Sequence, residues 1–131
     1  HRWDEPVYDY AWNLLNDYVE NGTEIDALYI VGHSLGGGIS QAVAARLYYM
    51  NKYFWDKEIE IKSYSLAAPG MTYGSRKFEF DLESLFMTSI VVHSDDDVVA
   101  KIDKQGGMSQ IVECREKSFA KCHPAYTANC E

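Results

Sequence analysis

The sequence predicts an α/β fold, with a mostly parallel sheet and helices on both of its faces. Short apolar segments of the kind that form buried parallel strands alternate with longer segments in which apolar residues recur at helical spacing. Strands and helices that alternate in this way form parallel sheets. The chain has 131 residues, which is enough for one domain with one core. We therefore expect residues 1–131 to form a single α/β domain.

The first helix is predicted near the N-terminus. Asp4-Glu5-Pro6 has the features of a helix start, an acidic cap region followed by proline in the first turn. Asn21-Gly22 is a typical helix end. Between these points the apolar residues recur at helical spacing, at Ala11, Leu14, Leu15, Tyr18 and Val19.

A strand and a second helix follow. Ala27 to Val31 is a short apolar run bounded by polar residues, as in buried parallel strands. After Ser34 the helical spacing returns, and this helix should end near Asn51. Its apolar face consists of Ile39, Ala42, Val43, Leu47 and Met50.

The rest of the chain continues the alternation. Ile59 to Ala67 is predicted to be a strand that ends at Pro69-Gly70, and Ser75 to Phe86 is predicted to be a helix. Met87 to His93 is the third predicted strand and Met108 to Cys114 the fourth. In such sheets reactive residues collect at the carboxyl ends of the strands, so the polar residues there are the functional candidates.

The composition excludes several classes of partner. Twelve basic and twenty acidic residues give a net charge of −8, and no more than two basic residues are adjacent. Nucleic acid and anionic lipid surfaces both require a basic face, so neither is expected as a partner. No apolar run approaches the roughly 18 residues that a membrane helix needs, so no transmembrane segment is expected. No pattern indicates the oligomeric state.

Three cysteines, Cys114, Cys122 and Cys130, fall within the last eighteen residues. A disulfide could join Cys122 to Cys130 or to Cys114, and an odd number leaves at least one thiol unpaired. His123 lies nearby, but there is no CxxC pair, so we expect no metal site. Asn21-Gly22-Thr23 is a glycosylation sequon, which favours secretion or a secretory-pathway compartment.

Gly32-His33-Ser34-Leu35-Gly36 is a Gly-x-Ser-x-Gly motif between a predicted strand and a predicted helix. In this context the serine sits on a sharp turn as a nucleophile, and the backbone N–H of Leu35 is the first donor to an oxyanion. We expect Gly32 and Gly36 to be small because backbone and helix pass close to the turn. The alternative is a chance match to the motif in a glycine-rich turn. Such a match would need neither a strand before it nor a helix after it.

A serine nucleophile needs a base, and the base needs an orienting carboxylate. In the strand-turn-helix type of site the order along the chain is Ser, Asp, His. Asp97 lies 97 − 34 = 63 residues after Ser34, and His123 lies 123 − 97 = 26 residues after Asp97. The alternatives are that Asp95-Asp96-Asp97 is only a solvated turn and that His123 is only a surface histidine. A calcium loop would need an EF-hand spacing that is missing.

The other three histidines are weaker candidates for the base. His1 is at the chain end, and His33 lies inside the motif, where it should point away from a productive position. His93 closes a strand and is expected to be packed or hydrogen-bonded locally.

These residues also carry a family resemblance. The string from Ile30 to Gly38, which contains GHSLGG, is similar to the nucleophile elbow of the class 3 lipases, the α/β-hydrolase family of fungal triacylglycerol lipases and diacylglycerol lipases. His1-Arg2, Ser65 to Gly70, Asp97 to Ile102 and Cys122-His123 resemble further segments of that family.

The resemblance implies a partial α/β-hydrolase fold and a serine-dependent hydrolysis of lipid carboxylic esters of the triacylglycerol, diacylglycerol or phospholipid type. Ser34, His123 and Asp97 would form the catalytic triad, and no cofactor is implied. The implied partner is a lipid ester substrate, met at a lipid–water interface.

Two departures from the family pattern leave alternatives open. The family usually has proline where Ala100 stands, which keeps Asp96 as a second candidate for the triad carboxylate. The family also has a region before the first helix that supplies a lid and a second oxyanion donor, so the chain resembles the C-terminal part of the domain. The alternative function is therefore a catalytically inactive, hydrolase-like interaction module. Acyl-chain and head-group preference are not indicated.

Overall fold

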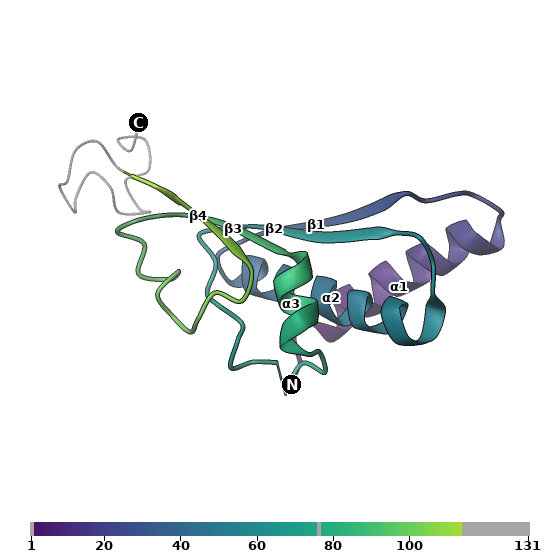
Figure 1. Ribbon diagram of the computed structural model, residues 1–131, viewed down its shortest axis with the longest axis horizontal. Helices are drawn as coiled ribbons and strands as arrows, with labels where there is room; N and C mark the ends of the chain where they lie inside the picture. Colours follow the sequence, from purple (N-terminus) through teal and green to yellow (C-terminus); the bar gives the residue numbers. More distant parts are fainter. Residues whose placement is uncertain (1, 76, 114–131) are drawn as a thin grey trace.

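The computed structural model describes residues 2–75 and 77–113. Its sheet has four parallel strands in the order β1-β2-β3-β4, namely Ala27–His33, Glu60–Leu66, Ser89–Ser94 and Met108–Val112 (Figure 1). Each of β2, β3 and β4 is thus paired with the strand that precedes it along the chain. This confirms the predicted α/β class and its parallel sheet.

The first two helices lie where the apolar spacing predicts them. Helix α1 spans Glu5–Glu20, with proline in its first turn, and α2 spans Leu35–Met50. Helix α2 continues into a π-helical turn, η1 (Asn51–Trp55), which ends at Asp56 with a left-handed φ of 51°. The predicted end near Asn51 is therefore the place where the α-helical hydrogen bonding stops, and the helical path runs on for one more turn.

The segment before β3 differs from its prediction. We expected a helix from Ser75 to Phe86, but α3 spans only Leu82–Thr88, and residues 72–75 and 77–79 form turns. The Asp81 side chain accepts a hydrogen bond from the Ser84 N–H at 2.7 Å, and such a cap fixes where a helix begins. The later helix moves the start of β3 from Met87 to Ser89.

The core lies between the helices and the sheet. Apolar residues of α1 pack against α2 and against the β2 residue Ile61, and the buried members of this cluster are Tyr8, Ala11, Leu15, Val43, Ala44, Leu47 and Ile61. A second cluster joins α2 to α3 through Ala42, Ala45, Phe80 and Leu85. Helix α2 is therefore the central helix, since both clusters depend on it.

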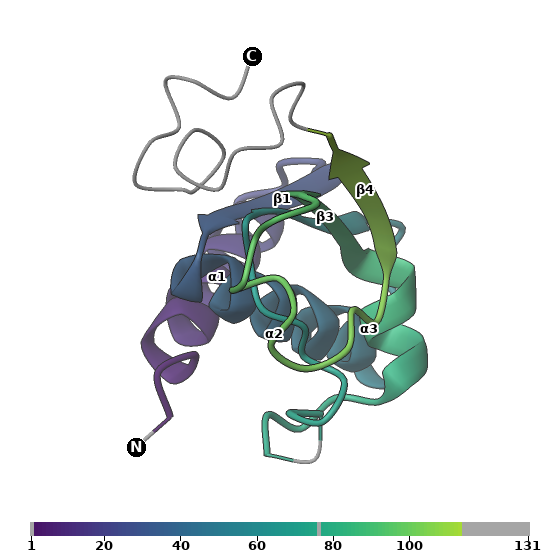
Figure 2. The ribbon, with the colours of Figure 1, turned by 90° about the vertical axis from the view of Figure 1, so that its left-hand side faces the viewer.

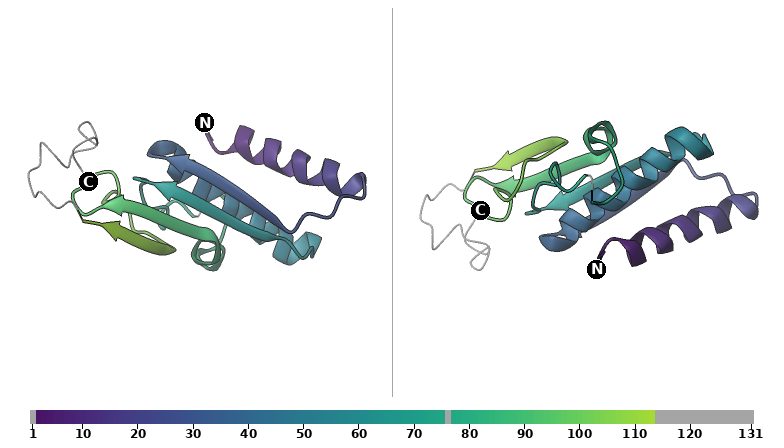
Figure 3. Two further views of the ribbon diagram at one scale, coloured as in Figure 1. Left: turned by 90° about the horizontal axis from the view of Figure 1, so that it is seen from above. Right: turned by 90° about the horizontal axis from the view of Figure 1, so that it is seen from below.

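The two faces of the sheet differ in their cover. Helices α1, α2 and α3 all lie on one face (Figure 2), and α1 flanks the sheet next to β1 when it is seen from above (Figure 3). The opposite face carries exposed apolar side chains, including Tyr29, Val31, Tyr64, Leu66 and Met108. The helices that we expected on this second face are not among the described residues.

The strands end together, at the side that faces the viewer in Figure 2. Because all four strands are parallel, the segments after β1, β2 and β3 come together at this edge. They are Ser34 with the start of α2, the loop that begins at Ala67, and the acidic turn from Asp95 to Asp97.

Candidate active site

The turn between β1 and α2 has an unusual backbone. Ser34 is the single residue between the two elements, and it has φ 54° and ψ −125°. A non-glycine residue in such a region costs on the order of 1–3 kcal/mol and needs a surrounding structure that holds it there. Here the Ser34 N–H donates to the carbonyl of Leu66 on the neighbouring strand at 2.9 Å. The strained serine is therefore held directly by the sheet.

Glycines around Ser34 permit the sharp turn, but they are not the pair that we expected. A Cβ at Gly32 would lie 2.2 Å from the carbonyl oxygen of Gly36, and a Cβ at Gly37 would lie 2.5 Å from the Cβ of Ala68. Among the described residues, a Cβ at Gly36 would meet nothing within 4 Å. The expectation of close packing is thus right for Gly32 and wrong for Gly36, and Gly37 is the second crowded position.

The start of α2 presents free backbone donors beside Ser34. Leu35 is the first residue of the helix, so its N–H has no acceptor within the helix. The Ser34 carbonyl is already occupied, since it accepts from Gly37 N–H at 2.9 Å and from Gly38 N–H at 3.2 Å. An N–H at a helix N-terminus suits a developing negative charge. The geometry at Leu35 therefore fits an oxyanion donor.

A buried cluster of three hydroxyl groups fixes this first turn of α2 to β2. Ser40, Ser63 and Ser65 lie within 3.0–3.1 Å of one another, and the Ser40 and Ser65 hydroxyls donate to the Gly37 carbonyl at 2.8 and 3.0 Å. Our sequence analysis missed this cluster. The signal was present in β2, where Ser63 and Ser65 alternate on the inward face, because small polar residues there let a helix approach closely.

The three carboxylates of the acidic turn after β3 differ in how deeply they are buried. Asp97 is 1% exposed, whereas Asp95 and Asp96 are partly exposed. One Asp97 oxygen, Oδ1, accepts from Val99 N–H at 2.9 Å, and the other, Oδ2, is buried with no partner among the described residues. Asp95 Oδ1 is likewise buried without a described partner. A buried carboxylate oxygen that lacks a donor is costly, so each of these oxygens calls for one.

Of the four histidines, the structure describes His33 and His93. His93 is bonded locally, as expected, since Nδ1 lies 2.8 Å from the Ser94 carbonyl oxygen and Nε2 lies 3.1 Å from the Ser109 hydroxyl. His33 is exposed at the end of β1. His123, the predicted base, lies outside the described residues, as do the three cysteines and their alternative disulfides.

The described part of the chain lacks two further kinds of feature. Residues 2–75 and 77–113 contain no group of three His, Cys, Asp or Glu side chains that could hold a metal ion. Within the same ranges, no helix has both the length and the apolar character needed to cross a membrane.

Comparison with known proteins agrees with this geometry. The family model described as "Lipase (class 3)" matches residues 5–106, a range that contains the strained serine and the acidic turn. No curated protein and no solved structure matches the chain. Since the family match covers most of the 131 residues, the chain belongs to the class 3 lipase family, whose general activity is the hydrolysis of lipid esters.

Proposed function

We propose that the protein hydrolyses lipid carboxylic esters through a catalytic triad of Ser34, His123 and Asp97, with the Leu35 N–H as an oxyanion donor. The observation that carries this proposal is the backbone of Ser34, which is strained at a strand-to-helix turn where a Cβ at Gly32 or at Gly37 would clash. Strain of this kind collects at active sites.

The proposed reaction runs in two steps with balanced proton transfers. The Ser34 hydroxyl oxygen attacks the ester carbonyl carbon, its proton passes to the imidazole of His123, and the carbonyl oxygen becomes an oxyanion at the Leu35 N–H. The alcohol then leaves with the proton from His123, and Ser34 remains acylated. In the second step water attacks the acyl carbon and gives its proton to His123. The bond between the acyl carbon and the Ser34 oxygen then breaks, His123 returns the proton to that oxygen, and a carboxylic acid is released.

Burial supports Asp97 as the orienting carboxylate rather than Asp96. An orienting group must accept a hydrogen bond from the imidazole away from competing water. Asp97 is buried, its Oδ1 is held by the Val99 N–H, and its Oδ2 has no donor among the described residues. Asp96 is partly exposed. We therefore place Asp97 in the triad and Asp96 outside it.

Substrate class and compartment are part of the same proposal. The family supports a lipid ester in general, and we propose the triacylglycerol, diacylglycerol or phospholipid type, met at a lipid–water interface. The sequon at Asn21 lies in an exposed turn after α1, which supports a secretory-pathway location.

Labelling with a fluorophosphonate, together with hydrolysis of a short-chain p-nitrophenyl ester, tests the nucleophile. Ser34→Ala should abolish labelling and lower the hydrolysis rate by several orders of magnitude, because nucleophile and base act as a unit. Ser94→Ala is the matched control, since Ser94 ends the neighbouring strand β3. Retained labelling in Ser34→Ala, or a rate within about tenfold of wild type, would exclude Ser34 as the nucleophile.

The alternative function, an inactive interaction module, is favoured by a different observation. The exposed face of the sheet carries Tyr29, Val31 and Leu66, and a large exposed apolar patch commonly marks an interaction surface. The two functions predict opposite results in the labelling experiment. A folded wild-type protein that neither reacts with the fluorophosphonate nor hydrolyses the ester would support the module.

A further inference from the structure

The first turn of α2 carries the proposed oxyanion donor, yet its own sequence does little to hold it in shape. Leu35 is followed by three consecutive glycines, residues 36–38. Glycine loses more conformational freedom on folding than any other residue. Ser34, at the cap position, makes no side-chain hydrogen bond to the helix. An oxyanion donor must be held in place before the reaction begins, so the rigidity of this turn has to come from its surroundings.

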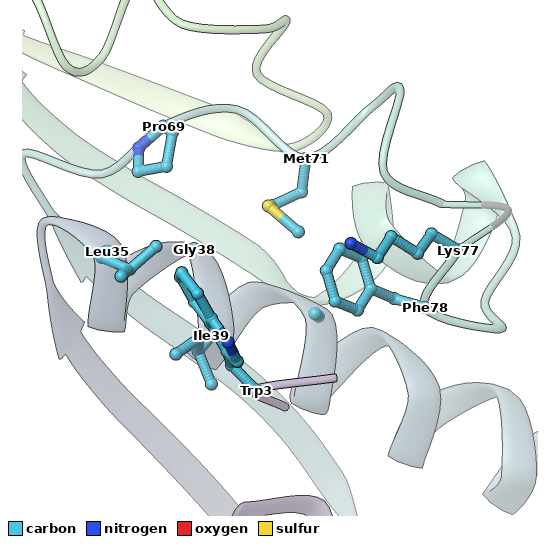
Figure 4. Close-up of a pocket in the computed structure, with 9 residues that line it drawn as sticks. Trp3, Leu35, Gly38, Ile39, Pro69, Met71, Lys77 and Phe78 are labelled. Atoms are coloured by element: carbon cyan, nitrogen blue, oxygen red, sulfur yellow. The ribbon is translucent and has the colours of Figure 1, made fainter. Parts of the chain in front are cut away.

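The cavity side of this turn is apolar. Leu35 and Gly38 line a cavity of about 440 Å³, whose other walls are apolar except for Lys77 (Figure 4). In Figure 4 Lys77 lies next to Phe78, at the far end of the cavity from Leu35. Among the described residues, the side chains that hydrogen-bond this turn are on its other side, which faces β2.

Two buried hydroxyl groups bond the turn on the side that faces β2. The hydroxyls of Ser40 and Ser65 donate to the Gly37 carbonyl at 2.8 and 3.0 Å, and both residues are at most 2% exposed. Each hydroxyl has a single hydrogen, so the only hydrogen left for bonds within the cluster is that of Ser63. The Ser63 hydroxyl lies 3.1 Å from the Ser40 oxygen and 3.0 Å from the Ser65 oxygen. Ser63 thus bonds to the cluster but not to Gly37.

The bonded carbonyl is connected to the oxyanion donor through two peptide groups. The Gly37 carbonyl shares a peptide with the N–H of Gly38, and this N–H donates to the Ser34 carbonyl at 3.2 Å. The Ser34 carbonyl in turn shares a peptide with the N–H of Leu35. Because hydrogen bonds in a chain polarise one another, a bond to each carbonyl makes the N–H of the same peptide a better donor. The two hydroxyls therefore act on the Leu35 N–H through a continuous series of hydrogen bonds.

We propose that Ser40 and Ser65 are positioning residues for ester hydrolysis, because they fix and polarise the turn that presents the Leu35 N–H to the oxyanion. The inference rests on the proposed function, since it gives the two serines a role in the step at Ser34. They act through the Gly37 carbonyl and not by contact with the ester. Their loss should therefore weaken stabilisation of the transition state and leave binding of the ester unchanged.

Steady-state hydrolysis of a short-chain p-nitrophenyl ester by alanine variants of the whole protein tests this role. Ser40→Ala and Ser65→Ala should each lower kcat by about five- to tenfold, and the double variant by about 10²-fold, the lower limit for loss of an oxyanion donor. KM should stay within about twofold of wild type, because removing an interaction made only in the transition state lowers kcat and kcat/KM alike.

Ser63→Ala is the matched control for these variants. It removes an equally buried hydroxyl from the same cluster, but it leaves both hydrogen bonds to the Gly37 carbonyl in place. Its kcat should therefore stay within about twofold of wild type. Thermal melting of every variant shows which of them are folded at the assay temperature.

A trifluoromethyl ketone with a short alkyl chain separates positioning from a loss of folded protein. The Ser34 oxygen adds to the ketone carbonyl carbon, the serine proton passes to His123, and the carbonyl oxygen becomes an oxyanion at the Leu35 N–H. The inhibition constant does not depend on the amount of folded enzyme. It should rise in the double variant by the factor by which kcat falls, and it should be unchanged in Ser63→Ala.

An active wild type whose double variant keeps both its kcat and its inhibition constant would overturn this inference alone. So would a loss in Ser63→Ala as large as that in Ser40→Ala or Ser65→Ala, because the loss would then come from repacking the cluster. If the double variant is unfolded, each single variant is compared with Ser63→Ala by the same criteria. A wild type that neither hydrolyses the ester nor reacts with the fluorophosphonate would instead overturn the proposed function, and this inference with it.

Discussion

The turn after β1 and the turn after β3 supply two members of the proposed triad, and they are constrained in different ways. Ser34 is held by its backbone, with a positive φ and a glycine contact that admits no Cβ. Asp97 is held by its surroundings, since its backbone is ordinary and its carboxylate is buried with one oxygen unpartnered among the described residues. A backbone constraint limits which residue types can occupy a position. Burial instead distinguishes one residue from others of the same type, here Asp97 from Asp95 and Asp96.

This difference decides what each substitution should do. Changes at the serine turn should affect folding first, because the crowded atoms belong to the backbone. Changes at the acidic turn should affect catalysis first. Of its three carboxylates only that of Asp97 is fully buried, and we propose that it orients the base. Four substitutions test this contrast, beginning with the largest expected effect.

Gly32→Ala should destroy the fold and, with it, all activity. Its Cβ would lie 2.2 Å from the Gly36 carbonyl oxygen, and neither backbone can move without breaking the turn. We expect a loss of more than about 4 kcal/mol in the free energy of unfolding. Thermal melting followed by circular dichroism measures it. A melting temperature within a few degrees of wild type would contradict the proposed backbone constraint.

Asp97→Asn should remove activity without removing the fold. Asparagine keeps the size of the side chain and the acceptor for the Val99 N–H, but it loses the charge that orients the base. We expect kcat to fall by about 10³–10⁴, with a melting temperature within about 5 °C of wild type. A fall in stability that matches the fall in rate would make Asp97 a structural residue instead.

Asp96→Asn is the matched comparison within the same turn. Because Asp96 is partly exposed, we expect its kcat to stay within about threefold of wild type, in line with the small effects of surface changes. Ester hydrolysis by the two variants should be measured side by side. If the large loss appears in Asp96→Asn and not in Asp97→Asn, then burial has selected the wrong carboxylate.

Gly36→Ala should have the smallest effect and the opposite sign to Gly32→Ala. Gly36 lies in the first turn of α2, and a Cβ there meets no described atom within 4 Å. Alanine is preferred to glycine in a helix by roughly 0.5–1 kcal/mol, so the melting temperature should rise by about 2–4 °C. Destabilisation would show that the crowding at this turn extends beyond Gly32 and Gly37.

Much of the fold could be predicted because its signals are local. The strand ending in Gly-x-Ser-x-Gly and the helix after it combine an apolar run, a turn motif and helical spacing within about 25 residues. The boundary near Ser89 could not be predicted from apolar spacing alone, because Leu85, Phe86 and Met87 suit a helix and a strand equally well. The start of α3 is set by the cap at Asp81, which was not distinguishable from the other acidic residues in the sequence.

The candidate site follows the same division. Ser34 and Leu35 could be predicted because motif and geometry coincide there. The choice between Asp96 and Asp97 depends on burial, which arises only when the chain folds. The hydroxyl cluster could be predicted only in part: the alternation of Ser63 and Ser65 in β2 is a local signal, but their partner Ser40 lies on a helix more than 20 residues away.

The consecutive order of the four strands has a consequence for how the protein forms during synthesis. Each new strand pairs with the strand made just before it, so the growing sheet offers the next segment an edge that is already in place. Folding during synthesis proceeds from the N-terminus as residues emerge. Once β2 has been made and has paired with β1, neither β3 nor β4 has to wait for a later strand before it can pair, and β1, α2 and β2 can assemble as a unit while the acidic turn is still being translated. The serine turn is thus built before the carboxylate that is proposed to serve it.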